Sequence, residues 1–185
     1  FFHQAAEIGL NPSQFLTFII RTSLAKRAIQ SKGQLAYAQL LQNLDDAIQL
    51  DQKAGTSKIR VAVILGGYSS ERHISVESGR NVYEKLSSSE KYLPLPVFLT
   101  GNSTAHHMYL LPINLLLKDN ADDIREKVEH FKVHPLIAEI QKQCKNITEK
   151  YASSASVKAP QKLSYADLKT NADEVFIALH GRPGE

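Results

Sequence analysis

Two short polar runs in this sequence carry side chains that can bind a small charged ligand. The first follows Gly66-Gly67 and contains Glu71 and Ser75, a carboxylate and a hydroxyl suited to ammonium and carboxylate groups. The second is His180-Gly181, which Arg182-Pro183-Gly184-Glu185 follows. Each run comes directly after an apolar stretch typical of a buried parallel strand. Open α/β sheets bind ligands at the carboxyl ends of such strands, so both runs are candidate site positions.

Taken singly, neither run identifies a function. The first is not a G-x-G-x-x-G dinucleotide loop, and no Gly-Lys-Ser/Thr follows it as in a phosphate-binding loop. Its glycine pair is equally consistent with a simple turn from a strand into a helix. A lone histidine at this position is more often the cap of a strand end. The two runs become informative together, because both would face the same edge of one sheet.

The elements that would carry these runs follow the order of a βαβ unit. We predict strands over Ile59–Leu65, Leu93–Thr100 and Val175–Leu179, since each is a nearly unbroken apolar run. A helix with Ser75 as its cap should follow the first strand. The predicted fold class is therefore α/β, with a Rossmann-like, mostly parallel sheet flanked by helices and preceded by a helical N-terminal segment.

The rest of the chain is predicted to be mainly helical. Residues 1–57 should form a helical hairpin and a linker: one helix starts at Asn11-Pro12-Ser13, Gly33 breaks the pattern, and Gly55-Thr56-Ser57 ends the segment. Residues 58–185 then form the α/β domain. Within it we predict a short strand, two helices and a polar loop, over Met108–Leu111, Asp122–Phe131, Pro135–Tyr151 and Ser153–Ser164.

Composition narrows the classes of function. The 185 residues carry 22 basic and 19 acidic side chains, and so small an excess does not indicate nucleic-acid binding. No apolar run is long enough to span a bilayer. Cys144 is the only cysteine, which excludes an internal disulfide and fits a reducing compartment. The adjacent pair His106-His107 has no third ligand at metal spacing, so we predict no metal site there.

The two runs together resemble a known family. Gly66-Gly67-x-Ser69-x-Glu71 with Ser75 is similar to the first motif of D-alanine–D-alanine ligases, and His-Gly-x-x-Gly-Glu at residues 180–185 is similar to that family's histidine–glycine signature. The resemblance covers Lys58–Glu185 and identifies it with the N-terminal domain that precedes the ATP-grasp domains. The two motifs stand further apart than is usual in the family, which we attribute to a helical insertion at about residues 119–160.

The resemblance implies a role for each matched residue. Glu71 would pair with the ammonium of the first D-alanine, and His180 would hold and orient the same substrate, so both are the predicted catalytic residues. Ser75 and Gly181 complete the predicted substrate-binding set, with Ser75 at a helix start facing a carboxylate. Where the family commonly has His-Glu, this chain has Arg72-His73, which removes an acidic residue beside Glu71.

For the whole protein, the resemblance implies an ATP-dependent ligase that joins two D-alanines in a bacterial cytoplasm. Its product would feed peptidoglycan precursor synthesis, and thereby cell-wall biogenesis and cell shape. ATP and Mg²⁺ would bind in central and C-terminal ATP-grasp domains that this chain does not contain, so the chain alone is expected to be inactive. The full-length protein is expected to be a homodimer with D-alanine as substrate and no nucleic-acid or membrane partner.

Two alternatives stay open at this level. The α/β domain could be a non-catalytic Rossmann-like binding or regulatory module, which the Arg72-His73 departure would favour. Residues 1–54 could dock a partner, although an amphipathic helical hairpin more often packs on its own chain. The identity of the second substrate, D-alanine, D-lactate or D-serine, depends on residues outside this chain.

Overall fold

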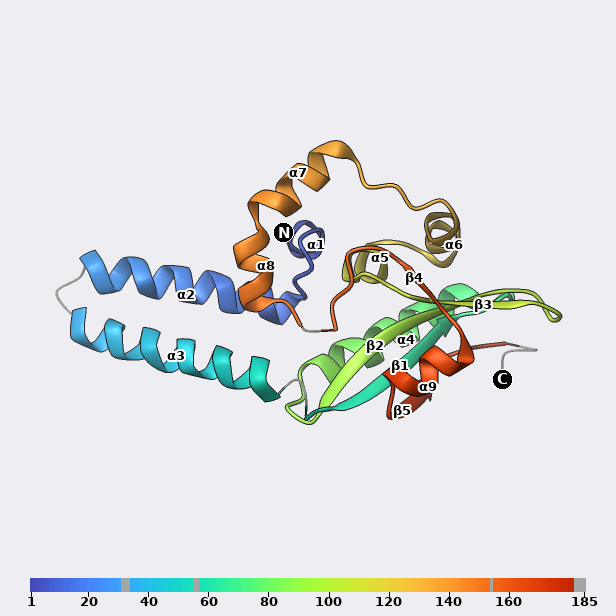
Figure 1. The fold of residues 1–185 in the computed structure, drawn as a ribbon, viewed down its shortest axis with the longest axis horizontal. Helices are drawn as coiled ribbons and strands as arrows, with labels where there is room; N and C mark the ends of the chain where they lie inside the picture. Colours follow the sequence, from blue (N-terminus) through green and yellow to red (C-terminus); the bar gives the residue numbers. More distant parts are fainter. Residues whose placement is uncertain (31–33, 55–56, 154, 182–185) are drawn as a thin grey trace.

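A computed structural model describes residues 1–30, 34–54, 57–153 and 155–181 (Figure 1). The predicted helix break at Gly33, the linker residues Gly55-Thr56 and the Arg182–Glu185 part of the second run lie outside the described residues. The helices are α1 (Phe2–Ala6), α2 (Pro12–Gln30), α3 (Gln34–Ala54), α4 (Arg72–Ser87), α5 (Ile113–Lys118), α6 (Ala121–Glu129), α7 (Pro135–Gln143), α8 (Lys145–Tyr151) and α9 (Tyr165–Asn171). The strands are β1 (Ile59–Gly66), β2 (Tyr92–Gly101), β3 (His106–Leu110), β4 (Gln161–Leu163) and β5 (Glu174–Ile177).

The strands form one sheet in the order β4-β3-β2-β1-β5. β1 lies at the centre of the parallel part, because it pairs in parallel with β2 on one side and with β5 on the other. β3 and β4 add an antiparallel edge beyond β2. The predicted α/β fold is confirmed, and the strands predicted to start at Ile59, Leu93 and Val175 all lie in this sheet.

Side chains along β1 alternate between two apolar cores, as the period of a strand requires. Val61, Val63 and Leu65 face the core that α4, α5 and α6 cover, and Val63 and Leu65 are fully buried there. Ala62 faces the opposite core, where Leu168 of α9 packs on the sheet. Because the middle of β1 has an apolar core on each face, residues 61–65 are all apolar and show no polar alternation.

Helix α4 begins earlier than the sequence predicted. It starts at Arg72, so Ser75 lies inside the helix and Glu71 is the N-cap residue. The Glu71 side chain makes no capping hydrogen bond. Gly79 lies where α4 crosses β1, since a Cβ built there would be 2.6 Å from the Cβ of Leu65. The helix can pack this closely on the sheet because glycine has no side chain at that point.

The structure corrects several predictions. The strand predicted over Val175–Leu179 is β5, which ends at Ile177 and is exposed rather than buried: Val175 is 49% exposed and Ile177 is 63% exposed. Among the described strands β5 pairs only with β1, so no strand covers its other edge. The helix predicted over Pro135–Tyr151 is broken at Cys144 into α7 and α8. The predicted loop Ser153–Ser164 contains β4 near its end.

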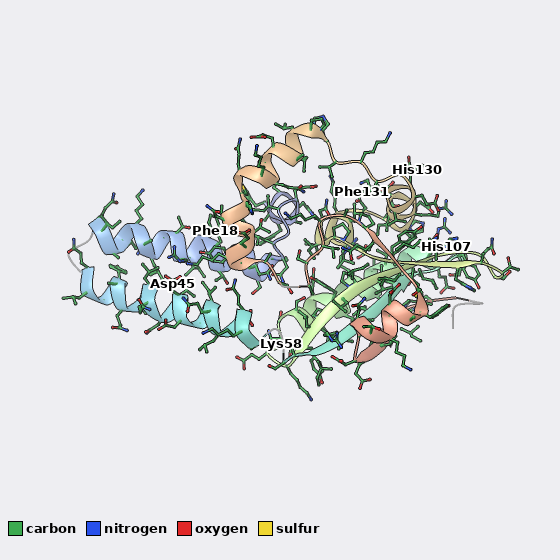
Figure 2. All side chains as sticks on the ribbon, viewed as in Figure 1. Phe18, Asp45, Lys58, His107, His130 and Phe131 are labelled. Atoms are coloured by element: carbon green, nitrogen blue, oxygen red, sulfur yellow. The ribbon has the colours of Figure 1, made fainter. Side chains whose placement is uncertain are left out.

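Helices α2 and α3 form a hairpin that extends away from the sheet (Figure 1). Its base packs on α8, where the rings of Phe18 and Tyr151 meet edge to face with centroids 5.6 Å apart. Asp45 of α3, labelled in Figure 2, binds Arg21 of α2 at 2.6 Å and Lys150 of α8 at 2.8 Å. One carboxylate therefore joins three helices. The helical segment therefore packs on its own chain.

Candidate functional site

The two polar runs start at the same edge of the sheet because β1 and β5 are parallel neighbours. Their pairing reaches Ile64↔Ile177, and the amide of Ala178 extends it by donating to the carbonyl oxygen of Ile64 at 2.8 Å. Segments that leave two adjacent parallel strands emerge side by side. The structure thus brings Gly66-Gly67 and His180-Gly181 together at the end where open α/β sheets bind ligands.

The glycine pair turns the chain out of β1 in a backbone conformation that other residues rarely adopt. Gly66 and Gly67 have φ angles of 92° and 89°. A Cβ on Gly66 would overlap the ring of Phe98, so the turn lies tightly against β2. The amide of Gly67 also donates to the carbonyl oxygen of Leu99 at 2.8 Å. The backbone is therefore fixed before the polar residues of the run begin.

Ser75 holds this turn from the other side. Its hydroxyl oxygen accepts the amide of Gly66 at 2.8 Å, and the side chain is 0% exposed. The hydroxyl therefore joins α4 to the end of β1, and Ser75 has no surface exposed to solvent. A direct contact between Ser75 and a substrate stays a prediction, whereas its contact with the glycine turn is part of the fold.

Ser69 joins the two runs, a role that sequence reasoning missed. Its hydroxyl donates to the carbonyl oxygen of His180 at 2.6 Å and accepts the amide of Glu71 at 3.1 Å. Gly181 has a φ of 77°, and a Cβ built on it would lie 3.3 Å from the Cβ of Glu71. One buried hydroxyl therefore holds the backbones of both predicted catalytic residues in contact. Ser69 belongs to the first motif, but the motif alone does not reveal its partner.

The side chains of Glu71 and His180 are held differently. Glu71 is exposed, and within the described part of the chain no cation or hydrogen-bond donor contacts its carboxylate. The Nε2 atom of His180 lies 2.9 Å from the hydroxyl oxygen of Ser78 on α4. The imidazole is thus oriented by α4, and the carboxylate is left available for a cationic ligand. No signal in the sequence indicated Ser78.

A small cavity of about 90 Å³ lies beside Ser69 and His180, and Glu71 is not among its lining residues. Tyr68 forms part of its wall, and its ring lies 5.6 Å from the ring of His106, at an angle of 49°. The sequence did not indicate His106 as a site residue, because its position depends on the pairing of β3 with β2. The space suits only a small molecule. The lining residues are Gly66, Gly67, Tyr68, Ser69, Leu99, His106, Leu179 and His180.

The residues that depart from the family pattern contact α6. Arg72 binds Asp122 through two hydrogen bonds, from Nε at 2.9 Å and from a terminal nitrogen at 3.0 Å. The Nε2 atom of His73 lies 3.3 Å from the same carboxylate. The Arg72 guanidinium holds the pKa of Asp122 below its usual range. Arg72 also donates to the carbonyl oxygen of Ser69 at 3.2 Å, so it touches the site loop as well.

Two larger hollows, of about 250 and 540 Å³, lie between the helical segment and the sheet layer. Neither is lined by a residue of the two polar runs. In the smaller one, Gln141 and Thr148 donate to the carbonyl oxygens of Glu7 and Ile8, at 2.8 Å each. These polar groups hold the turn after α1. We therefore place the candidate site at the ends of β1 and β5.

The described residues contain no group of three or more His, Cys, Asp or Glu side chains that could hold a metal ion. None of the helices within them is long and apolar enough to cross a membrane. Lys58, which begins the α/β part of the chain, binds Asp51 of α3 at 2.6 Å. The candidate site itself consists of the glycine turns after β1 and β5, the Glu71 carboxylate and the His180 imidazole that Ser78 contacts.

Together the fold and the candidate site define a Rossmann-like α/β domain whose two matched polar runs lie at the carboxyl ends of two parallel strands. A comparison with protein families agrees with this class: the model described as D-ala D-ala ligase N-terminus matches residues 60–185. The chain therefore belongs to the D-alanine–D-alanine ligase family, and this region is the family's N-terminal domain. Searches of curated proteins and of solved structures gave no match.

Proposed function

We propose that this chain is the N-terminal part of an ATP-dependent ligase that joins two D-alanines, and that it binds the first D-alanine. Glu71 supplies the carboxylate for the substrate ammonium, and His180 holds and orients the same molecule. Ser75 and Gly181 support these residues by fixing the two turns. One observation supports the proposal: the Ser69 hydroxyl binds the carbonyl oxygen of His180 and the amide of Glu71, so it holds the main chains of the two matched motifs together.

The physical chemistry of the site suits a small amino acid. An unpaired carboxylate at the start of a helix can form a charge-assisted hydrogen bond with an ammonium group. The adjacent cavity of about 90 Å³ has Leu99 and Leu179 in its wall, which can contact a methyl group but leave little room for a larger side chain. D-alanine combines these features, since it carries one ammonium and one methyl group.

The activity of the whole ligase needs more than this domain. ATP, when bound, supplies the phosphoryl group that activates a substrate carboxylate. The described residues provide no cluster of ligands for Mg²⁺, so the proposal assigns neither ATP nor Mg²⁺ a site in this chain. We accordingly expect the 185 residues alone to hydrolyse no ATP in the presence of D-alanine. A measurable turnover by the purified chain would contradict this part of the proposal.

We assign residues 58–185 to the substrate-binding domain, with a helical insertion at about 119–160, and residues 1–57 to an extension. The family match over residues 60–185 supports the first boundary. The dipeptide product would serve peptidoglycan synthesis in a bacterial cytoplasm, and the full-length ligase would act as a homodimer.

Replacing Glu71 by glutamine in the complete ligase tests the proposed role. The change keeps the size of the side chain and removes its charge. A hydrogen bond to a charged group is worth about 1.5–3 kcal/mol, so the constant for the first D-alanine should rise about ten- to a hundredfold while that for ATP stays unchanged. Glu84→Gln is the matched control, because Glu84 is an exposed glutamate further along α4. Unchanged D-alanine kinetics in Glu71→Gln would refute the assignment.

A non-catalytic binding module ranks second. The sequence feature that favoured it was the Arg72-His73 departure, and both of these side chains contact Asp122 of α6. The departure is therefore explained by a contact within the domain. Binding of D-alanine without any dipeptide product, in the complete polypeptide with ATP and Mg²⁺, would bring this alternative to first place.

A further inference from the structure

We propose that the ion pair between Arg72 and Asp122 positions the loop that carries Glu71, and that Arg72 is a positioning residue for the first D-alanine. The second half of this statement rests on the proposed function. Arg72 does not itself line the cavity, although it contacts Ser69, which does. Its effect on a substrate must therefore act through the residues that it holds.

Arg72 grips two partners at once. Its guanidinium makes two hydrogen bonds to the Asp122 carboxylate, at 2.9 and 3.0 Å, and another of its nitrogens donates to the carbonyl oxygen of Ser69 at 3.2 Å. The planar guanidinium has five N–H donors in fixed directions, so one side chain can satisfy a carboxylate and a carbonyl without changing its conformation. Lysine has no such geometry.

Helix α6 holds Asp122 in a fixed position. Asp122 lies in the first turn of α6, where the Asn120 side chain caps the helix by accepting the amides of Asp122 and Asp123 at 2.9 and 3.0 Å. The helix is fixed to the sheet core through Ile124, which is 0% exposed, and Val128. Movement of the α6 backbone at Asp122 relative to β1 would therefore require movement of the core.

The hydrogen bonds of Arg72 are connected to both proposed catalytic residues through Ser69. Arg72 holds the carbonyl oxygen of Ser69, while the Ser69 hydroxyl holds the amide of Glu71 and the carbonyl oxygen of His180. Loss of the ion pair would release one side of this residue. The loop could then move relative to β5, and a displacement of about 1 Å in a positioned group can cost up to about a hundredfold in rate.

The surroundings of Asp122 make it a shared partner. Besides Arg72, the Nε2 atom of His73 lies 3.3 Å from its carboxylate and a guanidinium nitrogen of Arg125 lies 3.7 Å away. The Arg72 and Asp122 side chains are 29% and 42% exposed. Pairs this exposed contribute little to the free energy of unfolding. The expected result of breaking the pair is thus a local change at the loop, with the fold intact.

The test replaces Asp122 by asparagine and compares it with Asp173→Asn. Asp173 forms a similar two-bond pair with Arg60, and those side chains are 39% and 44% exposed. That pair lies at the opposite end of β1 and β5, so it controls for the loss of an exposed ion pair. Amide hydrogen exchange at Glu71 should become roughly tenfold faster in Asp122→Asn and stay unchanged in Asp173→Asn. Arg72→Gln, which removes the other partner of the same ion pair, should also make amide exchange at Glu71 roughly tenfold faster.

Kinetics of the complete ligase supply the second measurement. Asp122→Asn should raise KM for D-alanine by about tenfold and leave KM for ATP unchanged. Equal Glu71 exchange in Asp122→Asn and Asp173→Asn would overturn the positioning role. If instead Glu71→Gln leaves D-alanine kinetics unchanged, the proposed function fails, while the exchange result still decides whether the ion pair holds the loop.

Discussion

The hydroxyl of Ser69 donates a hydrogen bond of 2.6 Å to the carbonyl oxygen of His180, across a separation of 111 positions in the chain. This bond joins the loop after β1 to the segment after β5, and the same hydroxyl accepts the amide of Glu71. The two family motifs meet through it. The geometry of the candidate site therefore depends on a serine that is 8% exposed.

Ser69→Ala should destabilise the protein and weaken D-alanine binding. The change leaves the His180 carbonyl and the Glu71 amide without their partner, which costs about 1–3 kcal/mol when such groups are buried. Urea unfolding measures the loss of stability. Ser70→Ala is the control, because Ser70 is the exposed neighbour and should change stability by less than about 0.5 kcal/mol. Equal unfolding midpoints for the two variants would contradict the bridging role.

Gly79→Ala should also destabilise the protein. A Cβ at this position would lie 2.6 Å from the Cβ of Leu65, and Leu65 is 0% exposed. Such overpacking costs about 1–3 kcal/mol, against a gain in helix propensity of about 1 kcal/mol. Asn81→Ala adds alanine at an exposed position of the same helix and should be neutral or stabilising. Thermal unfolding measures the melting temperature of both variants. A Gly79→Ala variant more stable than the parent protein would show that α4 is not packed this closely on β1.

Asp45 should give the helical segment a pH-dependent stability. Arg21, with help from Lys150, lowers the pKa of Asp45 from 3.8 to about 2. Because the pKa is depressed in the folded state, the stabilisation is complete above pH 3.8 and is lost as the pH falls through about 2. Asp45→Asn should cost about 1 kcal/mol near neutral pH, after allowance for solvent screening.

Unfolding by urea at neutral pH and at about pH 2 measures this difference between the parent protein and Asp45→Asn. The two should differ at neutral pH and converge in acid. Asp46→Asn is the control, since Asp46 is exposed and bonded only to Gln42 among the described residues. If the difference in free energy of unfolding between the two proteins were the same at both pH values, the charge of Asp45 would not be the cause of that difference.

Ile48→Ala should loosen the contact between the hairpin and α8. Ile48 is 9% exposed in the cluster that contains Tyr151, and truncation of a buried isoleucine costs about 2–5 kcal/mol. Leu35 lies near the far end of the hairpin and is 89% exposed, so Leu35→Ala should change stability by less than about 0.5 kcal/mol. Circular dichroism during thermal unfolding compares them. Similar melting temperatures would mean that the cluster contributes little.

The sequence predicts the central part of this fold because β1 and β2 are long, apolar and buried. It predicts the wrong environment for β5, since an apolar run looks the same whether it is buried or lies at an edge. β4 has only the residues Gln161–Leu163 and is held by β3 alone among the described strands, so its own sequence carries no strand signal. The helix after it could have been found: Ser164 and Asp167 form a capping box.

The same limit applies to the site. Glu71 and His180 can be chosen from the sequence, because each follows an apolar strand and matches a family motif. Ser78 and His106 cannot, since they reach the site only through the crossing of α4 over the sheet and the register of β3 on β2. Asp122 lies 50 positions from Arg72, and nothing in either segment marks the pair. Contacts between distant segments therefore account for the missed residues.

The helical hairpin within residues 1–54 and helix α8 bury each other's apolar side chains. We therefore expect these two distant segments to be conserved or lost together in evolution. Tyr151 is 9% exposed in a cluster to which Phe15 and Phe18 contribute, so a lineage that lost residues 1–54 would leave an aromatic side chain bare on α8. Residues in contact tend to change together. Related chains should accordingly keep both segments or lack both, and exchanges at position 18 should be accompanied by exchanges at position 151.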